Sequence, residues 1–355
     1  MAFFVKPTAY LHHLMRHYLI LAIVVYGCQP AGRSPSPVGP TSVTRSPTQI
    51  SPLPGAANPF GLMLGAGGLT IEQRIELVQL MGVPYFRPNS VFVQSWKGTC
   101  AECDAAQQAG LRLVLTVRNN GGDGQASRPP DDLDAYAHTL GAILDQYRPA
   151  LLIVENEENS NLFYSGTPEE YGAELKVACD TAHAFGIQCA NGGLVSKLVA
   201  LLVYEHYVDT GDTDHAQSFA ARVFAPDEQS QLDSPRTRQQ IQRGRALLQV
   251  YTASGADYIN FHWYITDATA LAEAVGFLSL QTGLPSMSNE IGQHDRSPET
   301  VRNLMKAVVQ LELPYAIWFS IDAPQAQALI NSDGTQRDNG LAFQEFIREQ
   351  FDASR

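Results

Sequence analysis

Two segments decide the fold of this chain: Glu155-Asn156-Glu157-Glu158-Asn159 and Ser288-Asn289-Glu290-Ile291-Gly292. The first follows the apolar run Ala150-Leu151-Leu152-Ile153-Val154, and the second follows Leu284-Pro285-Ser286-Met287. Each segment therefore places a glutamate where a short strand is expected to end. In α/β barrels the carboxyl ends of the strands form the face that carries chemistry. The two segments predict a (β/α)8 barrel with acidic side chains on that face.

Short apolar runs alternate with helix-like segments from about residue 60 onward. This alternation predicts parallel strands joined by crossover helices. The expected strands are residues 60–65, 84–88, 111–117, 150–155, 187–191, 258–264, 285–290 and 315–321. Eight strands is the number that a closed (β/α)8 or TIM barrel requires. A doubly wound open sheet is the alternative, but it would bring a ligand to one switch point, whereas polar residues here follow nearly every strand.

Helix-like segments fall between these strands, at residues 70–81, 131–147, 168–185, 267–282, 297–311 and 341–351. The stretch from about 195 to 257 is too long for a single crossover. It contains two helix-like segments with a polar section between them, so we expect an insertion on the rim after the fifth strand. The barrel domain with this insertion is expected to span residues 59–355.

The first 28 residues are typical of a targeting segment, with basic residues before an apolar run that is too short to span a bilayer. The run ends in Val25-Tyr26-Gly27-Cys28, which resembles the lipobox of bacterial lipoproteins, where lipid is attached to the cysteine. Residues 29–58 are rich in Pro, Ser, Thr and Gly, a composition that predicts an extended tether. We expect an extracytoplasmic protein anchored by lipid on Cys28 at the bacterial cell envelope. A secreted protein with an ordinary signal peptide is the alternative.

The composition suits one large globular domain, because 45% of the 355 residues are hydrophobic and 17% are charged. The net charge of −12 argues against nucleic acid or an anionic membrane surface as the main partner. Both of these partners attract clustered Lys and Arg side chains. A neutral carbohydrate fits the acidic chain better, and contact with a membrane is expected only through the lipid anchor.

Four cysteines remain besides Cys28, namely Cys100, Cys103, Cys179 and Cys189. An even number in an oxidising compartment permits disulfides, but the sequence leaves their pairing open. The Cys100-Ala101-Glu102-Cys103 spacing also occurs in redox and zinc sites. No second pair of Cys or His stands nearby, so a structural role is favoured.

Glycoside hydrolysis uses two carboxyl groups that flank the bond to be broken. In the first acidic segment, strand alternation points Glu155 and Glu157 to the same side and does not separate them. The run Asn156-Glu157-Glu158-Asn159 resembles the Asn-Glu-Pro-Asn segment of retaining glycosidases of clan A, the cellulase and mannanase superfamily, with Glu158 in place of proline. The resemblance implies that Glu157 is the general acid/base and that Asn156 binds the 2-hydroxyl of the sugar.

Further positions match the same superfamily pattern at the ends of later strands. Glu290, followed by Gly292, resembles the nucleophile in its Thr-Glu-Phe-Gly context. Arg87 resembles the arginine that keeps the nucleophile ionised. His262-Trp263-Tyr264 resembles a His-x-Tyr motif, which implies that His262 faces substrate and that Tyr264 bonds to the nucleophile. Trp318 resembles a tryptophan that forms a floor beneath the sugar.

The resemblance implies a retaining glycoside hydrolase that cleaves β-glycosidic bonds of a poly- or oligosaccharide by double displacement, and it implies no cofactor and no metal. Two departures favour an alternative, a catalytically inactive carbohydrate-binding barrel at the cell surface. These are Glu158 instead of proline, and Arg118-Asn119-Asn120 where many members have a histidine. An aldolase would need a lysine at a strand end, and a metal hydrolase would need paired ligands there, and neither pattern occurs in the sequence. The identity of the sugar, endo or exo action and the oligomeric state have no signal in the sequence.

Overall fold

The structure is a computed structural model that describes residues 57–65, 67–122, 124–324 and 326–352. The predicted targeting segment, Cys28 and nearly all of the predicted tether lie outside the described residues. Among the helices that are described, none combines the length and apolar composition needed to cross a bilayer.

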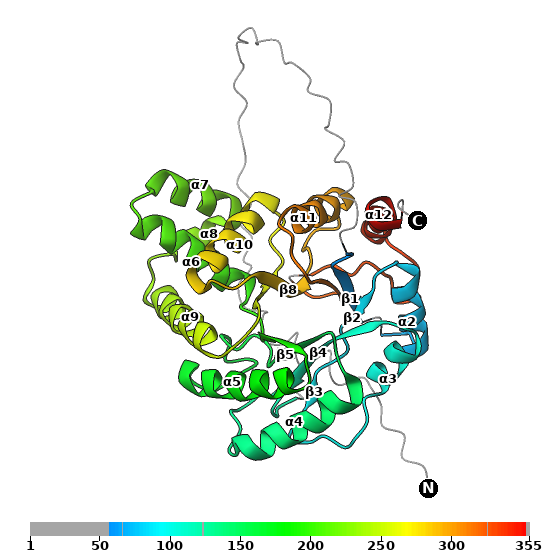
Figure 1. Ribbon diagram of the computed structural model, residues 1–355. Coiled ribbons are helices and arrows are strands. Elements are labelled where there is room, and N and C mark those ends of the chain that lie inside the picture. The colour runs from blue at the N-terminus through cyan, green and yellow to red at the C-terminus, as the bar shows by residue number, and fades with distance from the viewer. Residues whose placement is uncertain (1–56, 66, 123, 325, 353–355) are drawn as a thin grey trace. The chain divides into compact units, whose positions relative to one another are not determined.

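Eight parallel strands form a nearly closed barrel (Figure 1). Their order around the barrel is β6-β5-β4-β2-β1-β9-β8-β7, and a short strand, β3, pairs with β4. The predicted (β/α)8 barrel is confirmed. The strands are β1 (Phe60–Leu64), β2 (Tyr85–Phe86), β3 (Val91–Phe92), β4 (Arg112–Arg118), β5 (Leu151–Val154), β6 (Gln188–Asn191), β7 (Ile259–Trp263), β8 (Ser286–Ile291) and β9 (Ala316–Ser320).

The barrel closes between β6 and β7 through a few backbone contacts. Isolated bridges join Ala190 to Tyr258 and Leu194 to Phe261. The N–H of Leu194 donates to the carbonyl of Asn260 at 3.2 Å, and the N–H of His262 donates to the carbonyl of Leu194 at 2.8 Å. This closure brings the end of β7, which carries His262, beside the segment that follows β6.

The second predicted strand, residues 84–88, is shorter in the structure. Only Tyr85–Phe86 form β2, and the chain pairs with β4 again at Val91–Phe92. Pro88 has no N–H to give to a strand ladder, which accounts for the interruption. Arg87 still donates its backbone N–H to the carbonyl of Leu62 at 2.9 Å, so it is held at the end of the short strand.

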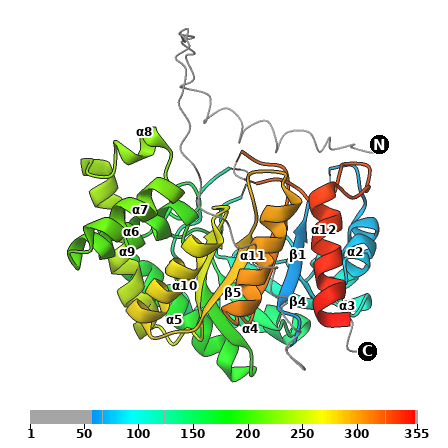
Figure 2. The same cartoon turned by 90° about the horizontal axis from the view of Figure 1, so that it is seen from above.

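The helices surround the strands as a ring (Figure 1), and α10, α11 and α12 lie side by side along one wall (Figure 2). Thr70 and Thr167 begin α2 and α5 with capping boxes. Four helices, α6 to α9, occupy the stretch between β6 and β7 where the sequence predicts an insertion. The helices are α2 (Ile71–Leu80), α3 (Ala101–Gln108), α4 (Leu133–Tyr147), α5 (Pro168–Ala184), α6 (Ser196–Asp209), α7 (Thr213–Val223), α8 (Pro226–Gln229), α9 (Pro235–Ala253), α10 (Ala268–Thr282), α11 (Pro298–Gln310) and α12 (Asp338–Ile347), which continues into the π-helix η2 (Arg348–Asp352).

Strand alternation divides the buried side chains into two layers. One small cluster packs together, made of side chains from alternate strand positions such as Val114, Leu151, Ile153 and Ile317. Most of the other buried apolar side chains of the strands join a much larger cluster shared with the helices. We assign the small cluster to the barrel interior, because side chains at alternate positions of a strand point to one face.

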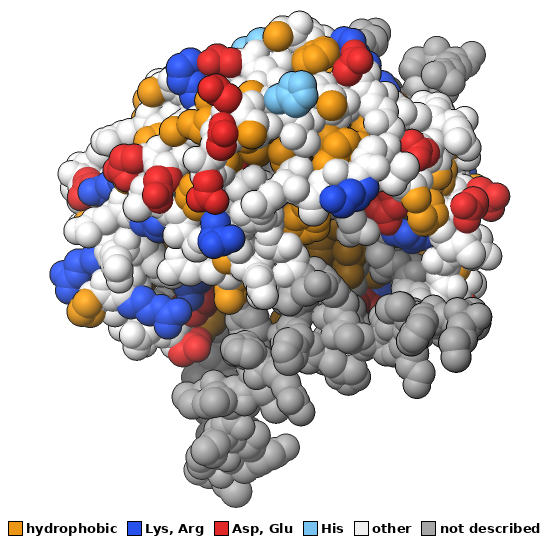
Figure 3. Space-filling model, turned by 90° about the horizontal axis from the view of Figure 1, so that it is seen from below, with side chains coloured by type: hydrophobic (Ala, Val, Ile, Leu, Met, Phe, Trp, Pro, Cys, Tyr) orange, Lys and Arg blue, Asp and Glu red, His pale blue; other side chains and the backbone are white. Residues whose placement is uncertain are grey.

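Two disulfides link the four cysteines in pairs that are close in sequence. Cys100 pairs with Cys103 at the start of α3, and Cys179 on α5 pairs with Cys189 on β6. The first bond uses both cysteines of the Cys-x-x-Cys run. The second ties a helix to the strand that follows it. On the face shown in Figure 3, acidic and basic side chains are interspersed, so the negative charge of the chain is not gathered into one patch there.

Candidate active site

Glu290 on β8 lies at the centre of the candidate site and is held by three side chains. Arg87 donates through Nη1 to Glu290 Oε2 at 2.5 Å, and Tyr264 donates its hydroxyl to Glu290 Oε1 at 2.5 Å. His262 Nδ1 lies 3.5 Å from the same Oε1 atom. Burial opposes the ionisation of Glu290, but the positive charges of His262 and Arg87, together with the hydrogen bond from Tyr264, outweigh it and lower its pKa. The site therefore keeps Glu290 as a carboxylate.

Arg87 is itself fixed by groups from several strands. Its Nε donates to Thr116 Oγ1 at 3.2 Å and its Nη2 donates to Asn156 Oδ1 at 2.9 Å. Its Nη1 also reaches the carbonyl of Asn289 at 3.2 Å. The side chain of Arg87 is only 3% exposed, so it faces Glu290 from a fixed position with little solvent screening.

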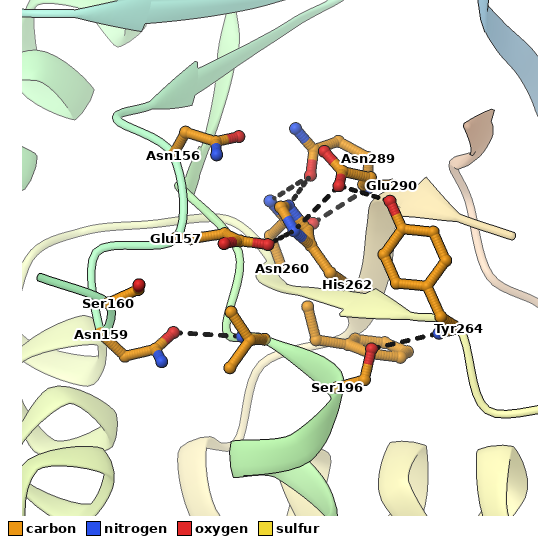
Figure 4. Close-up of polar contacts among 12 residues, drawn as sticks. Asn156, Glu157, Asn159, Ser160, Ser196, Asn260, His262, Tyr264, Asn289 and Glu290 are labelled. Carbon is orange, nitrogen blue, oxygen red and sulfur yellow. Dashed lines mark hydrogen bonds and ion pairs between the residues drawn. The ribbon is translucent and has the colours of Figure 1, made fainter. Parts of the chain in front are cut away.

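Glu157 extends into the same space from the loop after β5, and Glu157, His262, Tyr264 and Glu290 point toward one another in Figure 4. Its side chain is 14% exposed, whereas that of His262 is fully buried. The backbone reaches this position through two left-handed residues, Glu155 with φ of 67° and Glu157 with φ of 45°. Left-handed conformations are uncommon for residues other than glycine and cluster at functional sites.

The distance between the two carboxyl groups is short. One oxygen of Glu157, one oxygen of Glu290 and a ring nitrogen of His262 all lie within 4.8 Å of one another. Three such atoms are a possible metal-ligand set. However, the cationic guanidinium of Arg87 lies against Glu290 at 2.5 Å, and its positive charge opposes the binding of a metal cation there. The arrangement therefore suits acid/base and nucleophilic chemistry better than metal binding.

His262 connects the two carboxyl groups. Its Nδ1 lies 2.9 Å from Glu157 Oε1, and its Nε2 lies 3.1 Å from Asn289 Oδ1. Burial lowers the pKa of His262, but the charges of Glu290 and Glu157 and the hydrogen bond to Glu157 outweigh this effect and raise the pKa above its ordinary value. His262, between two acidic groups, therefore takes up a proton more readily than a free imidazole.

Beneath His262, three asparagines from neighbouring strands form a buried hydrogen-bonded row. Asn289 on β8 contacts Asn260 on β7, and Asn260 contacts Asn191 on β6. All three side chains are fully buried. Such a row inside a barrel fixes the relative positions of the strands that carry the site, because each amide has a defined donor and acceptor.

The other two glutamates of the acidic segment point away from the site and are fully buried. Glu155 accepts from the backbone N–H of Asn119 at 2.6 Å and from Ser127 Oγ at 2.7 Å. Glu158 accepts from Asn191 Nδ2 at 2.9 Å and from the hydroxyl of Tyr251. Burial raises the pKa of Glu155 to about 7 and also raises the pKa of Glu158. Of the three glutamates, the structure brings only Glu157 to Glu290.

Trp318 does not reach the site. It is fully buried, belongs to the helix-side cluster, and packs edge-on against Phe343 of α12 at 5.5 Å between ring centroids. The prediction that it forms a floor beneath a sugar is therefore wrong in this structure. Phe319, the next residue on β9, points the other way and packs edge-on against the ring of Tyr264, with 5.8 Å between the ring centroids. Both residues of the pair are apolar, so the sequence alone does not show which one faces inward.

The remaining predicted positions come together around the two carboxyl groups. Asn156 is buried and accepts from Arg87, while Arg87, His262 and Tyr264 contact Glu290 directly. Sequence reasoning did not find Phe319, the Asn191–Asn260 pair or the contact between His262 and Glu157. Buried asparagines in three consecutive strands are a signal, since an amide in an apolar strand needs a partner.

No protein-family model matches the sequence, and no curated protein matches it. Solved structures do match. A GH128 (subgroup VI) exo-beta-1,3-glucanase from Aureobasidium namibiae aligns with a TM-score of 0.50 at 12% identity, over 81% of this chain and 96% of that one. The beta-glycosidase BGL167 aligns with a TM-score of 0.51 at 13% identity, over 79% and 86% of the two chains.

The catalytic domain of beta-amylase from Paenibacillus polymyxa also aligns, with a TM-score of 0.51 at 8% identity, over 83% of this chain and all of that one. At such identities the similarity shows the fold, a barrel used by glycoside hydrolases. Two of these structures are named as a glucanase and a beta-glycosidase. The activity itself has to be argued from the site.

Proposed function

We propose that this chain is a retaining glycoside hydrolase that cleaves β-glycosidic bonds of an oligo- or polysaccharide. One observation carries the proposal: oxygens of Glu157 and Glu290 lie within 4.8 Å of each other at the carboxyl ends of β5 and β8. Retaining enzymes separate their two carboxyl groups by about 5 to 5.5 Å, whereas inverting enzymes leave about 6.5 to 9.5 Å for a water molecule. The short separation supports retention.

In the proposed reaction, Glu290 Oε attacks the anomeric carbon while Glu157 protonates the oxygen of the leaving group, so that the glycosidic bond breaks and a glycosyl ester forms. Water then attacks the anomeric carbon and gives its proton to Glu157. The bond between the sugar and Glu290 breaks, and the carboxylate is restored. Arg87 and Tyr264 hold the Glu290 carboxylate in place before attack and stabilise it again as a leaving group.

The side chains around the two carboxyl groups and the similar structures both support a neutral sugar as the substrate. The site has Asn156 as a neutral polar group beside the carboxyl groups and Phe319 as an apolar wall near Tyr264, which suits the polar edge and apolar face of a neutral sugar. Because one structure of similar fold is an exo-beta-1,3-glucanase, β-1,3-glucan belongs in the first set of substrates, beside cellulose, mannan and xylan oligosaccharides.

The test is hydrolysis of this set by the unmutated domain and by Glu157→Gln and Glu290→Gln. We expect each variant to lose hydrolysis by about 10²-fold or more while it still binds sugar. A 2-deoxy-2-fluoro glycoside should label Glu290 covalently, and peptide mass mapping should find the adduct there. Labelling at another residue, or products of inverted anomeric configuration, would refute the mechanism.

The alternative, a carbohydrate-binding barrel without turnover, is favoured by the end of β4. Asn119 turns its amide toward the carbonyl of Arg128, and its backbone N–H is used by Glu155, so this position gives no side chain to Glu157 or Glu290. The same experiment decides between the two. If the unmutated domain binds an oligosaccharide from the set and cleaves none, the binding function is correct.

We also propose that the domain is held outside the cytoplasm by lipid on Cys28, with residues 29–58 as the tether. The lipobox-like end of the apolar run supports this proposal. Expression of the full chain in a bacterium should place it in the membrane fraction, and Cys28→Ala should release it from that fraction. If both forms are soluble in the periplasm or medium, the anchor is refuted and a secreted enzyme remains.

A further inference from the structure

The orientation of the buried Asn260 amide is fixed by two backbone groups. Its Oδ1 accepts from the N–H of Asn289 at 3.0 Å, and its Nδ2 donates to the carbonyl of Asn191 at 2.9 Å. A backbone N–H is always a donor and a carbonyl is always an acceptor. The amide of Asn260 therefore has one orientation only.

That orientation determines the next amide in the row. Asn260 Nδ2 also lies 2.8 Å from the side chain of Asn289, and a donor there requires an acceptor opposite it, so the oxygen Oδ1 of Asn289 must face Asn260. The same Oδ1 lies 3.1 Å from Nε2 of His262. Because Oδ1 of Asn289 cannot donate, Nε2 of His262 must carry a hydrogen.

The close packing around the ring also favours a hydrogen on Nε2. A Cβ at Gly193 would lie 2.3 Å from Nε2, so only glycine lets the segment after β6 pack this close to the ring. If the neutral ring carried its hydrogen on Nδ1, the lone pair of Nε2 would face the lone pairs of Asn289 Oδ1 in a buried site. Two facing acceptors without a hydrogen between them are unfavourable.

We propose that Asn260 and Asn289 are positioning residues that keep a hydrogen on Nε2 of His262, so that Nδ1 shares one proton with the carboxyl group of Glu157. The role given to Glu157 rests on the proposed function. With Nε2 occupied, neutral His262 offers Nδ1 only as an acceptor, 2.9 Å from Glu157 Oε1. The pair then holds the proton in one of two places, on Glu157 or on Nδ1.

This arrangement serves the two halves of the proposed reaction. The proton moves from the pair to the leaving oxygen in the first half, and the pair regains one from water in the second. Neither half creates or consumes a proton beyond those of substrate and water. The charged and titratable groups that face His262 are Glu157, Glu290, Arg87 and Tyr264, and the buried Glu158 in the loop after β5 interacts with it through its charge. Their combined field favours a proton on the ring, since the pKa of His262 is raised despite its burial.

The first test is nitrogen NMR of the whole protein labelled with ¹⁵N-histidine and titrated without substrate between about pH 5 and pH 9. The chain has 9 histidines, so the signals of His262 are identified by their absence in His262→Gln. We expect Nε2 to stay protonated throughout and only Nδ1 to titrate. Titration at Nε2, or a ring that does not titrate at all, would overturn the proposal.

Two variants of Asn289 should move that titration in opposite directions. Asn289→Asp places a carboxylate on the Nε2 hydrogen, and we expect the loss of the Nδ1 proton to move up by about one pH unit. Asn289→Leu removes the acceptor, and we expect a shift of similar size downward. Where hydrolysis is measurable, the alkaline limb of the pH profile of kcat/KM should move with the NMR titration. Shifts in the same direction, or none, would refute the proposal.

Asn260→Asp is a second variant that keeps the size of the side chain. It loses the donor toward Asn289, so the Asn289 amide should rotate and present Nδ2 to His262. Neutral His262 is then expected to carry its hydrogen on Nδ1, which the same NMR experiment detects. An unchanged hydrogen on Nε2 in this variant would show that Asn260 does not fix the ring.

Asn339→Leu is the matched control, because Asn339 is an equally buried amide that donates to the carbonyl of Ala328, outside the site. It should leave the titration of His262 unchanged even if it lowers stability. The titration requires no turnover. A domain that never hydrolyses sugar would refute the proposed function and leave the NMR result standing. A domain that hydrolyses sugar but whose Nε2 titrates would refute the positioning role and leave the proposed function standing.

Discussion

Replacing Arg87 with methionine tests the electrostatic balance at Glu290 most directly. The substitution keeps much of the side-chain volume but removes the 2.5 Å ion pair with Glu290 and the contacts to Thr116 and Asn156. Removing one partner of a buried ion pair usually costs about 3–5 kcal/mol, because the other charge stays buried without compensation. Here His262 and Tyr264 remain beside Glu290, so we expect a loss near 3 kcal/mol at about pH 7.

The loss should depend on pH in a defined direction. In the unmutated protein the pKa of Glu290 is lowered, so its carboxylate contributes stability above its unfolded pKa and this contribution is lost as the pH falls through the folded pKa. Without Arg87, burial favours the protonated acid, and the variant can relieve its penalty by binding a proton. The difference in unfolding free energy between the two proteins should therefore shrink from about pH 7 to about pH 4.

Urea unfolding at several pH values measures this difference. Arg302→Met is the control, because Arg302 forms ion pairs with Glu345 and Glu349 on the surface, and such pairs contribute about 1 kcal/mol or less. Glu290→Gln in the Arg87→Met background should recover part of the lost stability. If Arg87→Met costs the same with glutamate and with glutamine at position 290, the reasoning about the uncompensated charge is refuted.

Three further outcomes are expected. Glu174 is a buried residue of α5, and burial raises its pKa and that of the adjacent Glu155, so ionisation of either is unfavourable in the folded state. Relative to the unmutated protein, Glu174→Gln should therefore have a free energy of unfolding that is higher at about pH 8 than at about pH 5 by at least ~1.4 kcal/mol. Denaturant unfolding of both proteins at both pH values checks it, and an equal effect at the two pH values would contradict it. Cys179→Ser with Cys189→Ser should cost roughly 3 kcal/mol for a separation of 10 residues, measured by the same method under non-reducing conditions. Trp318→Ala should cost about 3–5 kcal/mol of stability and leave the affinity for oligosaccharide unchanged by calorimetry, whereas a large loss of affinity would restore the sugar-floor hypothesis.

Much of the architecture can be predicted from the sequence because parallel strands and crossover helices each leave a clear pattern. The runs at residues 150–154 and 315–319 are apolar over their whole length, as is typical of buried parallel strands. That same property hides which side of each strand faces the barrel interior. Trp318 and Phe319 show the consequence, since both are apolar and only the register of β9 decides which of them meets Tyr264.

At the acidic segment, the sequence did not predict the side-chain directions for a different reason. Period-two alternation places Glu155 and Glu157 on one side, but it assumes extended backbone at both positions. Both residues instead have positive φ, so the chain turns between them and their side chains separate. Local sequence gives no reason for left-handed glutamates. Glu155 is held by Asn119 and Ser127, and Glu158, next to Glu157, is held by Tyr251. These partners lie far away in the chain and become neighbours only after folding.

These distant contacts give Glu158 a role that a proline at this position would not have. A proline pre-sets its own φ, whereas Glu158 is anchored through its side chain to Tyr251 and through its carbonyl to Arg243, which donates at 3.0 Å. Both anchors belong to α9, within the stretch between β6 and β7. Arg243 also donates to the carbonyl of Gly166 at 2.8 Å, so the same helix holds both ends of the loop that carries Glu157. The insertion is thus part of the support of the segment that carries Glu157.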